Sequence, residues 1–114
     1  MKYLILIASL LLFTKLSGFT QTNPKFKEIK IQTSAQCEMC KERIEEALAF
    51  EKGVKNSELD LKSKIVEVIY YPGRTNPEKI RKVISKAGYD ADDVLADEEA
   101  YKKLPLCCKK PDNK

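Results

Sequence analysis

The hydrophobic periodicity of residues 26–95 switches between that of strands and that of helices. Ile29, Ile31 and Thr33 share one face of the alternating residues 25–33, which predicts a half-buried strand. From Cys40 the apolar positions follow helical spacing, which predicts an amphipathic helix that ends before Gly53. The inward face of this helix comprises Cys40, Ile44, Ala47 and Leu48. The first unit is therefore a strand followed by a helix.

The second half of this region repeats the change of period. The alternating residues 57–61 and the β-branched and aromatic residues 65–71 predict the two arms of a hairpin. Thr75, Pro77 and Glu78 are helix-start signals, and Gly88 is suited to end that helix. Residues 89–95 are expected to form a short last strand. The order β-α-β-β-α-β predicts an α+β fold, a ferredoxin-like sandwich in which a four-stranded antiparallel sheet carries two helices on one face.

Residues 1–20 have the pattern of a signal peptide. Lys2 precedes an apolar run over residues 3–13, and small or polar residues occupy most of positions 17–21. The run is too short for a membrane span, which needs about 20 residues. We therefore expect residues 1–20 to be removed on export and residues 21–25 to form a linker. The mature protein is then periplasmic or extracellular and has no membrane span. Lys15 leaves an uncleaved membrane anchor as the alternative.

Composition narrows the chemistry that this chain can perform. The 114 residues include no His, which excludes Ser-His-Asp and Cys-His catalytic sites, a His general base and Cys₂His₂ zinc sites. The 21 basic and 17 acidic residues are too evenly balanced to indicate nucleic acid or an acidic membrane as a partner. The length suits one small domain, expected at residues 26–95, followed by a tail at residues 96–114.

Cys37 and Cys40 form a CxxC motif between the first strand and the first helix. The start of a helix offers unpaired N–H groups and partial positive charge, which lower the pKa of a nearby thiol. A pair of thiolates without His suits Cu(I), while Zn(II) and other thiophilic ions also bind such ligands. The motif therefore predicts a soft-metal site. A structural disulfide and buried free thiols are the alternatives.

The tail at residues 96–114 carries the other two cysteines, Cys107 and Cys108. A short helix is expected at its start, with acidic residues in the first turn, basic residues in the last turn and Pro105 behind it. Cys107 and Cys108 either add ligands to the metal site, form disulfides, or do neither, and four cysteines allow three pairings. Because the tail offers few apolar side chains, we expect it to modulate the metal site without being needed for the fold.

Several motifs resemble those of the heavy-metal-associated domain family, which includes copper chaperones, N-terminal domains of copper ATPases and periplasmic mercury-binding proteins. Beyond the CxxC motif, the matching stretches are residues 53–54, 59–61, 66–72 and 87–91, and the resemblance covers residues 26–95. It implies that Cys37 and Cys40 bind Cu(I), Hg(II) or a similar ion near the surface. It also implies that Tyr89, in the Gly-Tyr-x-Ala motif, packs beside them. Ala35 departs from the family, which usually has Met at this position, while Met39 is expected to face solvent.

The leading hypothesis is a non-catalytic exported protein that captures a soft metal ion for transfer or sequestration. The ion expected first is Cu(I), with Hg(II) or Zn(II) next, and a metal-transporting ATPase or another metal acceptor is the expected partner. One alternative is a thiol-disulfide oxidoreductase that uses the same CxxC motif. However, Gln36, Glu38 and Met39 differ from the residues typical of thioredoxin-like sites. A further alternative is a domain whose cysteines only cross-link the fold.

Overall fold

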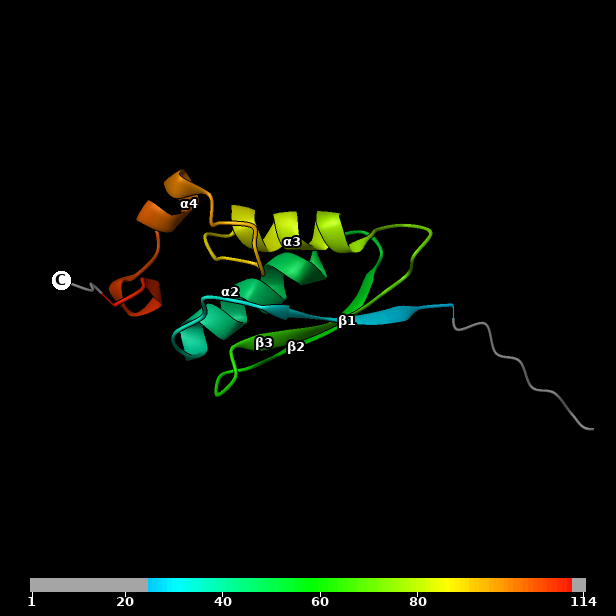
Figure 1. Cartoon of the computed structure of the whole chain (residues 1–114), viewed down its shortest axis with the longest axis horizontal. Coiled ribbons are helices and arrows are strands. Elements are labelled where there is room, and N and C mark those ends of the chain that lie inside the picture. The colour runs from blue at the N-terminus through cyan, green and yellow to red at the C-terminus, as the bar shows by residue number, and fades with distance from the viewer. Residues whose placement is uncertain (1–24, 112–114) are drawn as a thin grey trace, which may run out of the picture.

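The computed structural model describes residues 25–111 (Figure 1). The expected signal peptide, residues 1–20, lies outside the described residues. The elements in chain order are β1 (Lys27–Gln32), α2 (Glu38–Ala49), β2 (Val54–Asp60), β3 (Ile65–Tyr70), α3 (Pro77–Lys86), α4 (Glu98–Lys102) and the 3-10 helix η2 (Leu106–Cys108). Within residues 25–111, no helix is both long and apolar enough to cross a membrane.

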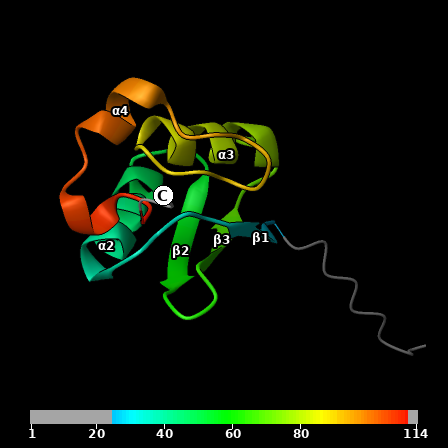
Figure 2. The same ribbon diagram turned by 60° about the vertical axis from the view of Figure 1, so that its left-hand side comes forward.

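The strands form an antiparallel sheet in the order β1-β3-β2. β1 pairs with β3 from Lys27↔Tyr70 to Gln32↔Ile65, and β2 pairs with the other side of β3. Figures 1 and 2 show α2 and α3 on the same face of this sheet. The inward residues of the strands and the apolar faces of both helices meet in one core, whose largest fully buried side chains include Ile31, Ile44, Leu48, Val66, Val68, Ile80, Ile84 and Tyr89. The α+β class is confirmed, and the arrangement is consistent with a ferredoxin-like fold.

The prediction of a fourth strand at residues 89–95 is wrong, since the sheet of the described residues has three strands. Isolated bridges join Thr33 to Ala91 and Ala91 to Val94 in place of a ladder. Asp92 adopts the left-handed region with a φ of 52°, and this turns the chain away from β1. Its carboxylate accepts the backbone N–H of Gln32 at 2.9 Å, so it occupies the position of a ladder hydrogen bond. A tight turn therefore replaces the last strand.

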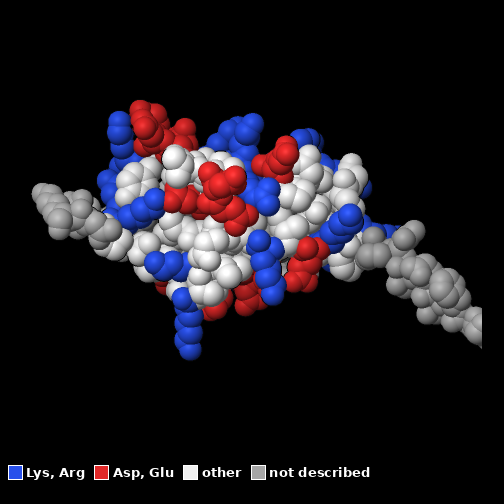
Figure 3. All heavy atoms as spheres, in the orientation of Figure 1, with Lys and Arg blue, Asp and Glu red and all other residues white. Residues whose placement is uncertain are grey.

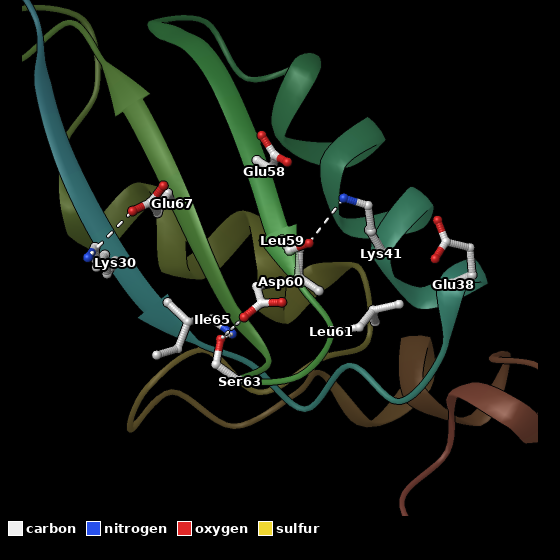
Figure 4. Close-up of a pocket in the computed structure, with 10 residues that line it drawn as sticks. All are labelled: Lys30, Glu38, Lys41, Glu58, Leu59, Asp60, Leu61, Ser63, Ile65 and Glu67. Carbon is white, nitrogen blue, oxygen red and sulfur yellow. Dashed lines mark hydrogen bonds and ion pairs between the residues drawn. The ribbon is translucent and has the colours of Figure 1, made fainter.

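Two side chains of α2 protect the edge of β2. The Lys41 ammonium donates to the carbonyl of Leu59 at 3.0 Å, and the backbone N–H of Leu59 donates to the Glu45 carboxylate at 2.8 Å. Unpaired backbone groups on an edge strand invite pairing with another chain, so these contacts act against aggregation. The pocket drawn in Figure 4 adjoins this edge. No cysteine is found among the described residues that line this pocket.

Charged side chains of both signs are interspersed over the face seen in Figure 3. Ion pairs within the described residues include Arg81 with Asp92 at 2.8 Å and Lys30 with Glu67 at 3.5 Å. The Lys30–Glu67 pair is exposed and is drawn in Figure 4. Exposed pairs of this kind contribute little to stability because water and salt screen them.

The tail packs onto the domain more closely than the sequence predicted. The expected short helix is present as α4, whose N-cap Asp97 accepts the backbone N–H of Ala100 at 3.0 Å. After α4, the side chains of Leu104 and Cys108 are buried members of the hydrophobic core. Figures 1 and 2 place η2 beside the start of α2. The last described residues therefore lie at the end of the domain where the CxxC motif is found.

Candidate metal centre

The loop between β1 and α2 is held in place by hydroxyl groups. Thr33 donates from its hydroxyl to the carbonyl of Lys64 at 2.8 Å and accepts the backbone N–H of Ala35 at 3.2 Å. The hydroxyl of Ser34 accepts the backbone N–H of Asp90 at 2.9 Å, which ties this loop to the Gly-Tyr-x-Ala segment. Ala35 is fully buried at the position where the family usually has Met. These contacts fix the backbone from which the CxxC motif begins.

Cys37 and Cys40 occupy the first turn of α2. Cys37 is the N-cap residue, and its carbonyl accepts the backbone N–H groups of Cys40 at 3.0 Å and Lys41 at 3.1 Å. The turn brings the two sulfur atoms within 3.1 Å of each other. Cys40 is 0% exposed, whereas Cys37 is half-buried. The motif thus has one inner and one outer thiol.

The two tail cysteines lie against this pair. The Cys37 sulfur is 3.0 Å from that of Cys107 and 3.6 Å from that of Cys108. The sulfurs of Cys37, Cys40 and Cys108 all lie within 4.8 Å of one another and form a group that could hold a metal ion. All four thiols are free, and none of the four possesses a disulfide partner in the described residues. The structure therefore brings together all four cysteines that the sequence singled out.

Tyr89 lies directly behind the thiols. Its side chain is fully buried, and its hydroxyl has no hydrogen-bond partner among the described residues. Burial raises the pKa of Tyr89, and contacts of its hydroxyl with the sulfurs of Cys108 and Cys40 raise it further. Tyr89 is therefore a protonated donor that faces two potential thiolate acceptors.

The thiol of Cys37 ionises more readily than the two thiols of the tail. Burial alone would raise the pKa of Cys37, but contacts with the thiols of Cys107, Cys40 and Cys108 and with the backbone N–H of Cys40 lower it to about 7. The pKa of Cys108 is raised, chiefly by burial and by its contact with Cys40. The pKa of Cys107 is raised by its contact with Cys37 and by burial. Of these three thiols, Cys37 is the one that ionises near neutral pH.

We expect Cys37 to be alkylated by iodoacetamide much faster than Cys40 in the folded, reduced protein. The thiolate is the reactive form, and Cys37 combines partial exposure with a pKa of about 7. Its labelling rate should rise as the pH passes through this value, while the fully buried Cys40 should react only after urea unfolds the chain. Peptide mass spectrometry of timed samples measures both rates. Faster labelling of Cys40 at neutral pH would contradict this assignment.

Sequence reasoning missed the residues that hold the tail over the thiols. Lys110 forms an ion pair with Asp90, and its backbone N–H donates to the Tyr101 hydroxyl at 2.9 Å. Burial alone would raise the pKa of Asp90, but Lys110 and the backbone N–H of Ala96 lower it overall. Lys110 lies in the tail, outside the matched motifs, and its partner Asp90 is the variable position of the Gly-Tyr-x-Ala motif. No local pattern could therefore have identified them.

The donor set determines which ions fit. The cluster found in the described residues consists of thiols alone. Thiolates are soft ligands that select Cu(I), Zn(II) and related ions, whereas Mg(II) and Ca(II) require oxygen ligands. A thiol loses its proton when it binds a metal, so uptake releases protons to solvent. The arrangement is suited to hold a soft metal cation at the end of the domain.

Known proteins resemble part of this chain. The family model "Heavy-metal-associated domain" matches residues 34–90, which is half of the chain. A copper-exporting P-type ATPase of Staphylococcus aureus (strain JH9) is 39% identical over 59 residues, a stretch that makes up 52% of this chain and 7% of the ATPase. This chain therefore spans only a small part of the length of that relative.

Solved structures agree with this result. The water-soluble region of the P-type ATPase CopA from Bacillus subtilis superposes with a TM-score of 0.57 and 35% identity, over 61% of this chain and 47% of that one. Oxidized MerP from Ralstonia metallidurans CH34 gives a TM-score of 0.57 over 59% of this chain and 94% of MerP, and its 18% identity shows a common fold. Together with the Cys37–Cys40 pair at the start of α2, these matches show that the chain belongs to the heavy-metal-associated domain family.

Proposed function

We propose that this protein captures a soft metal ion, Cu(I) in the first place, with the thiolates of Cys37 and Cys40, and delivers it to an acceptor or sequesters it. The observation that carries the proposal is the pair of sulfurs 3.1 Å apart in the first turn of α2. Hg(II) and Zn(II) are the next candidates, because thiolates bind them as well. Related domains occur in proteins described as copper-exporting ATPases, which favours copper as the cargo.

The difference in exposure between the two thiols supports transfer by ligand exchange. Cys37 lies near the surface, so a thiolate of an acceptor can approach the ion from that side while Cys40 still holds it. The ion then moves as thiolates replace one another, and no step requires the metal to be free in water. A metal-transporting ATPase or another metal acceptor with its own thiolates is the partner that this exchange calls for.

Export is part of the same proposal and is based on the sequence. The apolar run at residues 3–13 and the small or polar residues that follow it have the features of a cleaved signal peptide. The protein would then act in the periplasm or outside the cell. Free thiols tend to oxidise in such compartments, and a bound soft metal ion would protect them.

The experiment that tests the proposal combines metal titration with a redox assay on the reduced full chain. With Cu(I) buffered by a chromophoric chelator, we expect each chain to take up a single Cu(I) tightly. In an insulin-reduction assay we expect no turnover above the background of the reductant, because domains of this family bind metal and are generally not enzymes. A chain that reduces insulin efficiently and does not compete for Cu(I) would instead support the oxidoreductase alternative.

A further inference from the structure

Cys108 is a buried thiol that the CxxC motif does not require. Its side chain is 1% exposed, and it reaches the core from η2, which lies outside the stretch matched by the family model. Its sulfur is 3.6 Å from that of Cys37 and within 4.8 Å of that of Cys40. A third thiol therefore lies beside the pair.

The spacing of these three sulfurs is suited to one shared ion. With a metal–sulfur distance of about 2.3 Å, three sulfurs at the corners of a triangle around one ion are about 4 Å apart. The observed separations include 3.1 Å between Cys37 and Cys40 and 3.6 Å between Cys37 and Cys108. Small side-chain rotations would open this triangle enough to hold an ion at its centre.

Contacts on both sides of Cys108 hold the tail in this position. On one side, Leu104 is 6% exposed and packs against Gly88. On the other side, Lys110 pairs with Asp90 and donates its backbone N–H to Tyr101. Because the chain is anchored before and after Cys108, the thiol is presented to the site without further ordering of the tail. Such preorganisation raises the effective concentration of a tethered ligand.

The Tyr89 hydroxyl supplies an independent observation. It is fully buried, makes no hydrogen bond within residues 25–111, and lies near the thiols of Cys108 and Cys40. Buried hydroxyls are normally hydrogen-bonded, so an orphan donor needs an acceptor. Thiolates in a metal complex are charged acceptors, and Tyr89 would stabilise them at these two sulfurs.

From this geometry we infer that the tail is a latch that supplies Cys108 as a third thiolate ligand to the ion held by Cys37 and Cys40. The inference rests on the proposed function, which supplies the ion. Cys107 contacts the cluster from its exposed side, with its sulfur 3.0 Å from that of Cys37 and 3.9 Å from that of Cys108. A third thiolate tethered beside the pair raises the affinity through its effective concentration, and release of the ion then requires the latch to open.

The test compares Cys108→Ser with Cys107→Ser in the full, reduced chain loaded with Cu(I). X-ray absorption at the copper edge counts sulfur ligands, and competition with bathocuproine disulfonate measures affinity and release rate. We expect three sulfur ligands in the wild type and in Cys107→Ser. In Cys108→Ser we expect two sulfur ligands, an affinity lower by roughly 10²-fold and correspondingly faster release.

Three results would overturn the latch. The first is a copper ion with two sulfur ligands in the wild type, a measurement that stands even if Cys108→Ser fails to fold. The second is a folded Cys108→Ser variant that keeps wild-type coordination and affinity. The third is the loss of one sulfur ligand in Cys107→Ser instead of in Cys108→Ser. Failure of the wild-type chain to take up Cu(I) at all would refute the proposed function, which is a different outcome. Circular dichroism of each metal-free variant establishes that it is folded.

Discussion

The Cys37→Ser/Cys40→Ser variant is expected to bind Cu(I) at least about 10³-fold more weakly than the wild type, because a chelating pair of thiolates is lost. The two sulfurs are placed 3.1 Å apart by the first turn of α2, which orders them before the metal arrives. Serine oxygen is a hard, protonated donor that Cu(I) does not favour. The remaining thiols of Cys107 and Cys108 are adjacent on η2, and neither belongs to the chelating pair at the start of α2.

Met39→Ala is the matched control for this variant. Met39 lies between the two cysteines, and its side chain is 45% exposed, in line with the expectation that it faces solvent. The substitution removes the thioether sulfur of Met39 from the same turn and leaves all four thiols in place. The affinity for Cu(I) should therefore remain that of the wild type. Both variants are measured in competition with the same chelator. Wild-type affinity in the double serine variant would show that the metal site lies elsewhere.

The helices were predictable from sequence because their apolar residues recur with a helical period. Cys40, Ile44 and Leu48 are buried in α2, and Ile80 and Ile84 are buried in α3. The hairpin of β2 and β3 also follows from local alternation and turn residues. The structure of residues 89–95 was harder to predict, because a short stretch that mixes apolar residues with three Asp is compatible with a strand or a turn. The turn is stabilised by hydrogen bonds between Asp92 and Gln32, which are sixty positions apart in the sequence.

The CxxC pair was predictable because its two cysteines are close in sequence, whereas the position of the tail was not. A tether can leave Cys107 and Cys108 close to the site or far from it, depending on where the tail docks. Docking is set by Leu104 against Gly88 and by Lys110 with Asp90, and each contact joins segments with no shared periodicity. The CxxC motif could therefore be found from the sequence, whereas the pairing and placement of the tail cysteines could not.

Gly88→Ala is expected to lower the free energy of unfolding by about 2–4 kcal/mol, because it adds backbone strain and overpacking at one position. Gly88 ends α3 with a φ of +106°, a conformation that residues with a side chain rarely adopt. A Cβ atom there would lie 3.1 Å from the side chain of Leu104 and 3.2 Å from the backbone carbon of Ala100. The side chain of Leu104 can shift a little, but the backbone of α4 cannot move without disturbing the tail.

Gly73→Ala is the matched control, since a Cβ atom at Gly73 would meet nothing within 4 Å. The free energy of unfolding of Gly73→Ala should differ from that of the wild type by less than about 1 kcal/mol, as for most surface substitutions. Urea unfolding of the metal-free proteins, followed by circular dichroism, measures both changes. Because Gly88 supports Leu104, which anchors the tail ahead of Cys108, Gly88→Ala should also weaken Cu(I) binding in chains that are still folded. Equal unfolding midpoints for the two alanine variants would show that the tail does not pack on Gly88 in solution.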